Sequence, residues 1–110
     1  MDLELKLIRN TLVVRIAGDM DMLVAEELRT QIDSRLDNNQ VNNLIVNLEK
    51  VTFIDSSGLG VIIGRYKKVS AAGGKMYIAG VKPAIEKILF LSGINRLIPI
   101  FKNEQDVLSI

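Results

Sequence analysis

The spacing of the apolar residues changes after Gly18, and this change restricts the possible folds more than any other feature of the sequence. Before it, apolar and polar residues alternate over 3–7 and a second apolar segment covers 12–16, which predicts two strands joined by a tight turn. After it, apolar residues recur at helical spacing over 25–36, with charged residues on the other faces. The first third of the chain therefore predicts a β-hairpin followed by an amphipathic helix.

Strand and helix then alternate to the end of the chain. We expect Asp19 or Asp21 to cap the amphipathic helix. The later segments expected are a polar turn over 38–43, a buried strand at 44–48, a strand at 53–54 followed by a turn and a helix over 59–69, a strand at 75–79, a helix from Pro83 to 92–93, a short strand within 97–101 and a helical turn within 104–110. Two opening strands followed by this alternation predict an α/β fold, with a mixed sheet of four to five strands and helices packed on it. At 110 residues, the chain is expected to form a single domain over 1–110.

Two residue types are missing from the sequence, which removes much catalytic chemistry. Without His or Cys the chain has no Ser-His-Asp or Cys-His centre, no zinc site of the common kinds and no disulfide. We therefore expect a protein that is not an enzyme and uses neither a metal nor a cofactor. The net charge of +1 is too small for the wide positive field that binds nucleic acid or anionic lipid. No apolar stretch is long enough to span a bilayer and the opening MDLELKL lacks the features of a secretory signal, so we expect a cytoplasmic protein without membrane insertion.

The turn at 53–60, with the sequence FIDSSGLG, is the part of the chain best suited to recognition chemistry. Ligands and partners of α/β proteins tend to bind where a strand leads into a helix. The first backbone N–H groups of a helix have no partner inside it, so a phosphate on Ser56 or Ser57 would be stabilised there. Gly58 and Gly60 carry no side chain, which leaves room for another protein to approach the two hydroxyls.

The sequence of this turn is also compatible with roles other than recognition of a partner. An Asp-Ser-Ser-Gly turn before an apolar helix is also an ordinary capping arrangement, and spacing alone does not separate the two. Gly58, Gly60 and Gly64 are spaced one residue too widely for the dinucleotide fingerprint, and the sequence contains no lysine-bearing phosphate loop. A serine hydrolase is disfavoured because, without His, only Lys or a carboxylate is left to act as the base.

The turn and its flanks resemble the anti-sigma factor antagonists of the STAS domain family. The resemblance rests on DSSGLG at 55–60, preceded by VNLE at 46–49 and followed by VIIGRYK at 61–67, and it extends over essentially the whole chain. The continuation GRYK and the segment GDMD at 18–21 are most similar to the sporulation anti-sigma F antagonists within that family. Asp19 stands where the family often has Glu, which conserves the charge. The resemblance implies a single STAS-like domain.

The resemblance also implies a switch by exchange of partners. In this family the unphosphorylated antagonist binds an anti-sigma factor that is also a serine kinase, and so releases the sigma factor. Carried over by position, Ser56 is the phosphoacceptor, its phosphorylation by that kinase abolishes binding, and a serine phosphatase acting on phospho-Ser56 restores it. Asp21 and Asp55 fall at positions associated with kinase contact and with the geometry of the phosphoacceptor. The partner-binding residues expected in this chain are Asp21, Asp55, Ser57, Gly58 and Leu59, in a protein that acts as a monomer.

A second function is compatible with the same turn. A passive STAS module would bind a nucleotide or a small anion at the helix N-terminus that follows residues 55–56. Outside the turn, we expect the basic residues at 65–68 to form a solvated helix face, with a contact role as the alternative. Core packing is favoured for Phe90, and the alternative is an exposed hydrophobic contact beside the serine turn. Met20 and Met22, on either side of Asp21, are expected either to contact a partner or to fill the edge of the core.

Overall fold

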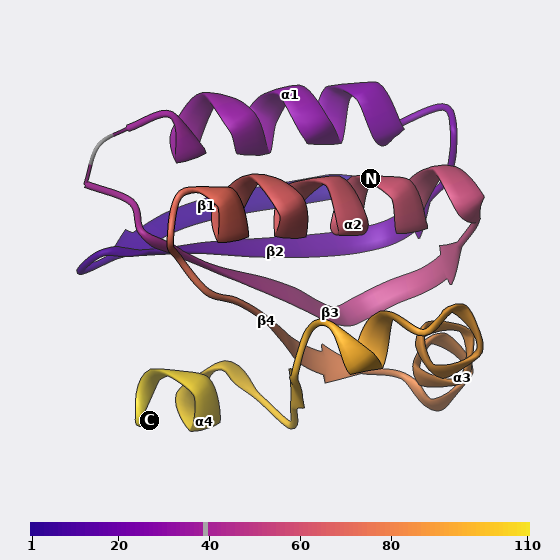
Figure 1. Cartoon of the computed structure of the whole chain (residues 1–110). Coiled ribbons are helices and arrows are strands. Elements are labelled where there is room, and N and C mark those ends of the chain that lie inside the picture. The colour runs from indigo at the N-terminus through magenta and orange to yellow at the C-terminus, as the bar shows by residue number, and fades with distance from the viewer. Residues whose placement is uncertain (39) are drawn as a thin grey trace.

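The computed structural model describes residues 1–38 and 40–110, and its strands and helices alternate after an opening hairpin (Figure 1). The elements are β1 (Asp2–Ile8), β2 (Thr11–Met20), α1 (Ala25–Leu36), β3 (Asn43–Ile54), α2 (Ser56–Ala71), β4 (Met76–Val81), α3 (Pro83–Ser92), the 3₁₀ helix η1 (Ile94–Arg96), β5 (Ile100–Phe101) and α4 (Glu104–Leu108). The predicted order of elements is confirmed, except that the segments predicted as strands at 44–48 and 53–54 are one continuous strand. The turn predicted over 38–43 includes residue 39, which lies outside the described residues.

The five strands form one mixed sheet in the order β1-β2-β3-β4-β5. β1 runs antiparallel to β2, whereas β2, β3, β4 and β5 are parallel to one another. Leu44, Ile45 and Val46 of the central strand are all buried, and consecutive strand residues point to opposite faces, so both faces of this strand are covered. The predicted α/β fold with a mixed sheet is confirmed, at the upper limit of the expected number of strands.

The two faces of the sheet are covered unequally. α1 and α2 lie next to each other over one face, where Leu28 of α1 and Ile62 of α2 join the main hydrophobic core (Figure 1). On the other face, Val107 of the short helix α4 packs with Val13 and Ile45 in a much smaller cluster. The site described below lies at the edge of the sheet where α1 and α2 begin.

The start of α1 differs from the prediction that Asp19 or Asp21 caps it. Val24 occupies the N-cap position and makes no side-chain hydrogen bond to the helix. Asp19 lies in β2, and Asp21 accepts a hydrogen bond from the backbone N–H of Leu23, with 3.1 Å between Oδ1 and N. The backbone carbonyl of Asp21 accepts from the N–H groups of Val24 and Ala25 instead. The helix is therefore started by backbone contacts, and the carboxylate of Asp21 orders the loop before it.

The favoured core position of Phe90 is also wrong, and the exposed position that the sequence left open is observed. Phe90 is 55% exposed, whereas Ile85 and Leu89 of the same helix are buried. Adjacent residues of a helix point about 100° apart, so the face that buries Leu89 turns Phe90 toward solvent.

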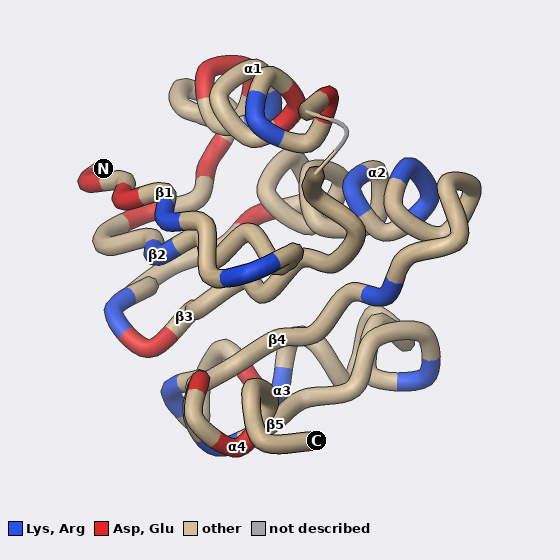
Figure 2. The backbone as a smooth tube through the Cα atoms, turned by 90° about the vertical axis from the view of Figure 1, so that its left-hand side faces the viewer, with Lys and Arg blue, Asp and Glu red and all other residues tan. Residues whose placement is uncertain are grey.

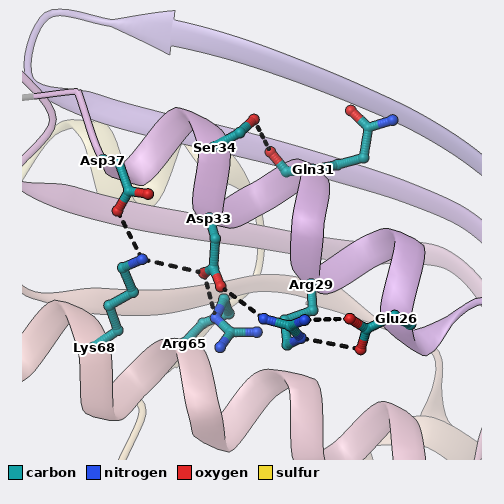
Figure 3. A network of polar contacts seen from close by, with 8 residues as sticks. All are labelled: Glu26, Arg29, Gln31, Asp33, Ser34, Asp37, Arg65 and Lys68. Carbon is teal, nitrogen blue, oxygen red and sulfur yellow. Dashed lines mark hydrogen bonds and ion pairs between the residues drawn. The ribbon is translucent and has the colours of Figure 1, made fainter.

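The solvated basic face predicted at 65–68 is wrong for Arg65, which is only 8% exposed. Its side chain points toward α1, where Nε lies 2.9 Å from Oδ1 of Asp33 (Figure 3). Lys68 of α2 reaches Oδ1 of Asp37 at 2.7 Å and Oδ1 of Asp33 at 3.7 Å, and Arg29 also contacts Asp33. Figure 2 shows both signs of charge on α1 and basic residues on α2. This group of charges forms because α1 packs over a face of α2 that the sequence pattern places in water.

Helix α2 starts in close contact with the end of β2, and Gly58 makes this contact possible. A Cβ atom on Gly58 would lie 2.4 Å from the carbonyl oxygen of Met20 and 2.8 Å from Cγ1 of Ile54. These separations are shorter than van der Waals contact, so no larger residue fits without a shift of the backbone. A Cβ atom on Gly64, two turns along the same helix, would meet nothing within 4 Å.

We expect Gly58→Ala to lower the free energy of unfolding by roughly 1–3 kcal/mol, because it forces extra volume against packed backbone. Gly64→Ala is the matched control and is expected to raise that free energy by up to about 1 kcal/mol, because Ala is the better helix former. Urea denaturation of both variants measures the difference. Equal stabilities for the two variants would contradict the close packing of α2 on β2.

We expect Asp33→Asn to lower the free energy of unfolding by roughly 2–4 kcal/mol, because it leaves the buried guanidinium of Arg65 without its nearest carboxylate. Glu26→Gln is the control on the same helix. Glu26 pairs with Arg29 in a largely exposed position, where water screens the charges, so its loss is expected to change the stability much less. Denaturation midpoints of the two variants test this, and a Glu26→Gln effect as large as that of Asp33→Asn would refute it.

Candidate functional site

The candidate site lies where the parallel strands β2 and β3 end side by side. Met20 pairs with Ile54 in the register of the two strands, and the N–H of Asp55 donates to the carbonyl of Met20 at 3.2 Å. The chain continues from Met20 into the loop that precedes α1, and from Asp55 directly into α2. The register therefore brings the predicted residues at 21 and at 55–59 to the same edge of the sheet, although they are more than thirty positions apart.

Asp55 makes the central contacts of the site. Its backbone is extended and it occupies the N-cap of α2, where Oδ1 accepts hydrogen bonds from the N–H groups of Ser57 at 2.8 Å and Gly58 at 3.1 Å. Its other oxygen, Oδ2, accepts from the N–H of Met22 at 3.1 Å. The capping arrangement that the sequence left open is thus present, and the same carboxylate also holds the loop before α1.

The two serines of the turn differ in exposure. Ser56, the first residue of α2, is exposed, whereas Ser57 is half-buried. Gly58 is buried against β2, and Leu59 is half-buried against the main core. Of the two serines, Ser56 is therefore the one more open to another protein, while Asp55 and Gly58 hold the backbone in place.

Two exposed apolar residues, Met22 and Leu23, lie beside these polar groups, and the sequence predicted a contact role for Met22 alone. Met22 is 73% exposed and Leu23 is 85% exposed, and both lie in the loop held by Asp55 and Asp21. Met22 was expected either at the core edge or against a partner, and the structure places it in solvent. Leu23 carried no prediction. Its signal in the sequence is an apolar pair, Met22-Leu23, that falls before the helical pattern begins.

A second polar cluster lies on the thinly covered face of the sheet, beside a cavity of about 740 Å³. Arg15 of β2 donates to Glu104 of α4 through Nε and Nη2, each at 2.8 Å, and to Glu4 through Nη1 at 3.1 Å. The hydrogen bonds from Arg15, helped by one from Asn47, hold the pKa of Glu104 below its ordinary value despite partial burial. These contacts fasten α4 to the sheet, so the charged groups of the cluster are already paired with one another.

The described residues show no sign of a metal site. Within 1–38 and 40–110, no group of three or more carboxylates lies close enough together to hold an ion. Over the same ranges, none of the helices combines the length and the apolar character needed to cross a membrane.

Comparison with known proteins agrees with the resemblance seen in the turn. The STAS domain profile matches residues 2–107. The anti-sigma F factor antagonist of Paenibacillus polymyxa is 35% identical over 109 residues, which are 99% of this chain and 93% of that protein. The solved structure of the anti-sigma factor antagonist SpoIIAA in its unphosphorylated form has a TM-score of 0.85 at 27% identity and covers 97% of this chain and 93% of its own. The Bacillus cell fate determinant SpoIIAA in the phosphorylated form has a TM-score of 0.79 at 27% identity, over 98% of this chain and 97% of its own.

The family assignment follows from these matches together with the geometry. The matched region includes every strand and both helices that form the site. The Asp-Ser-Ser-Gly turn on which the resemblance was based lies at an open edge of that fold. The chain belongs to the STAS domain family.

Proposed function

We propose that this protein is an anti-sigma factor antagonist that is switched off by phosphorylation of Ser56. Relatives named as antagonists of anti-sigma F and anti-sigma B factors match over most of the chain, which supports the general function. The exposure of Ser56 beside the fixed carboxylate of Asp55 is the observation that carries the assignment of the phosphoacceptor. A kinase needs a hydroxyl that it can reach, and Ser56 is exposed at the first position of α2.

The partner in this proposal is an anti-sigma factor that is also a serine kinase. Of the predicted contact residues, Asp55, Ser57, Gly58 and Leu59 adjoin Ser56 in the chain, and Asp21 orders the loop that Asp55 holds. Gly58 is buried, so its part in binding is to let α2 start close to β2. Met22 and Leu23 add exposed apolar area next to these polar groups. An apolar centre with a polar rim is the usual composition of a protein–protein interface.

Phosphorylation acts on this surface through charge and bulk. The kinase transfers the γ-phosphoryl group of ATP to Oγ of Ser56, ADP leaves, and the hydroxyl proton passes to a base of the kinase. The phosphate adds about 1.5 to 2 negative charges at neutral pH, next to the carboxylate of Asp55. A partner surface that fits a hydroxyl rejects this anionic group. Solved relatives in the unphosphorylated and in the phosphorylated form both match this fold, which supports a switch without refolding. In this proposal a serine phosphatase then removes the phosphate and restores binding.

The passive anion-binding module is less well supported. A free anion at the start of α2, which unlike a phosphate on Ser56 is not held there by a covalent bond, would have to displace Asp55, which already accepts from the N–H groups of Ser57 and Gly58. The carboxylate also places a negative charge where the anion would sit, and like charges in contact repel. We therefore propose a regulatory binding protein of the cytoplasm, without catalytic activity of its own.

We expect Ser56→Ala to bind the anti-sigma factor of the source organism with unchanged affinity and to be resistant to phosphorylation. Ser56→Glu places a charge at the same position and is expected to weaken binding at least tenfold, because a like-charged or desolvated group in an interface costs more than one decade of affinity. Isothermal titration with the purified anti-sigma factor measures the affinities. Mass spectrometry after incubation with that factor and ATP locates the phosphate.

Ser57→Ala is the matched control, because Ser57 is adjacent and half-buried. It is expected to be phosphorylated on Ser56 like the unmodified chain. Phosphate on Ser57, or an affinity of Ser56→Glu equal to that of Ser56→Ala, would overturn the proposed switch.

A further inference from the structure

We propose that Asp55 is a positioning residue that holds the Met22-Leu23 loop in its docking conformation, and that phosphorylation of Ser56 releases this loop by drawing Asp55 away from it. This inference rests on the proposed function and assigns a mechanism to its switch. It adds a second effect to direct repulsion at Ser56, because the phosphate also changes the apolar part of the surface.

The geometry gives one carboxylate two tasks. Oδ1 of Asp55 accepts from the N–H groups of Ser57 and Gly58, and Oδ2 accepts from the N–H of Met22 at 3.1 Å. The two oxygens belong to one rigid planar group, so a movement that breaks the first set of bonds also moves the second oxygen. The start of α2 and the loop before α1 are coupled through this group.

Besides the bond from Asp55, the loop is held by its own turn, in which the backbone carbonyl of Asp21 accepts from the N–H groups of Val24 and Ala25. Met22 and Leu23 are 73% and 85% exposed, so their side chains contribute little packing. The next helix, α1, starts at Ala25, and its N-cap residue Val24 makes no side-chain hydrogen bond to it. The side-chain bonds to the loop backbone are those of Asp55 to Met22 and of Asp21 to Leu23. A segment with few buried contacts and solvent-exposed hydrogen bonds opens at low cost, so the loss of one bond changes its conformation.

A phosphate on Ser56 competes with Asp55 for the same donors. Ser56 is the first residue of α2, so its phosphate oxygens lie within reach of the N–H groups at the start of the helix. These groups include the N–H of Ser57 and of Gly58, which Asp55 occupies in the unphosphorylated chain. The phosphate carries more charge than the carboxylate and repels it, so the equilibrium shifts toward a displaced Asp55 and a free Met22 N–H.

Hydrogen exchange of the Met22 amide, followed by NMR, tests the inference without any partner. Phosphoserine is installed at position 56 of the full chain by genetic encoding. We expect the Met22 amide to exchange about ten- to a hundredfold faster than in the unmodified chain, the range that corresponds to the loss of a hydrogen bond to a charged group. Amides of β3, remote from the turn, are expected to exchange at unchanged rates.

Asp55→Asn isolates the contact with the loop. Asn caps helices as well as Asp does, and its single carbonyl oxygen serves the two donors of α2. Its NH₂ group then faces the N–H of Met22, where two donors cannot bond. We expect Met22 exchange in this variant to rise as much as in the phosphorylated chain, with α2 intact. Phosphoserine at position 56 in the Asp55→Asn background is expected to add less than twofold, because the bond it would break is already lost.

Asp19→Asn is the control, because the carboxylate of Asp19 accepts from the hydroxyl of Thr52 on the neighbouring strand, away from the bond between Asp55 and Met22. It is expected to leave Met22 exchange unchanged. The inference is overturned if phosphoserine at position 56 leaves Met22 protected, or if its effect adds in full to that of Asp55→Asn. Either result leaves the proposed function standing when phosphorylation still abolishes binding, since repulsion at Ser56 then accounts for the switch. Unchanged binding of the phosphorylated chain would instead contradict the proposed function itself.

Discussion

The parallel pairing of β2 with β3 is the constraint on which the site depends. It sets Met20 beside Ile54, so that the chain leaves both strands at the same edge of the sheet and enters α1 and α2 from there. The close approach at Gly58 fixes the start of α2 against the end of β2. With the backbone held this tightly, the side chain of Asp55 can reach two segments that are far apart in sequence. A shift of one residue in the register would turn the side chains of the shifted strand to the opposite face of the sheet and would separate Asp55 from the loop before α1.

The charged contacts between α1 and α2 serve the same arrangement farther along the helices. Arg65 is almost buried, and Asp33 gives it a carboxylate from the opposite helix. Removing a charge from water is unfavourable, so such a pair adds less to stability than to the choice of one packing over others. Because each of the two helices begins at the site, a fixed separation between them also fixes the separation of the Met22-Leu23 loop from Ser56. The distant ion pairs therefore bear on the shape of the docking surface.

The alternation of strands and helices and the position of the Asp-Ser-Ser-Gly turn were both predictable from the sequence, because each depends on residues close together in the chain. Apolar spacing reports on one element at a time, so it located α1 and α2 but not the face by which they touch. Arg65 was for this reason expected in solvent, although α1 covers it. The cap of α1 was misassigned because the carboxylate of Asp21 bonds within the loop to Leu23. The contact of Asp55 with Met22 joins residues 33 positions apart in the chain. It could not be predicted because it depends on the register of β2 against β3, which the sequence pattern does not give.

The cost of moving each part of the site explains how a phosphate could act without unfolding the protein. Gly58, Ile54 and Met20 are buried together, and separating them would expose core surface and require much of the stability of a domain of this size, about 5–15 kcal/mol. The Met22-Leu23 loop is held by a few separate hydrogen bonds, two from carboxylates and two from the backbone carbonyl of Asp21, each contributing only about 0.5–3 kcal/mol. A phosphate is worth at most a few such bonds, so it is strong enough to rearrange the loop and too weak to displace α2. By the same difference in cost, removal of a phosphate from Ser56 would restore the loop without any step of refolding.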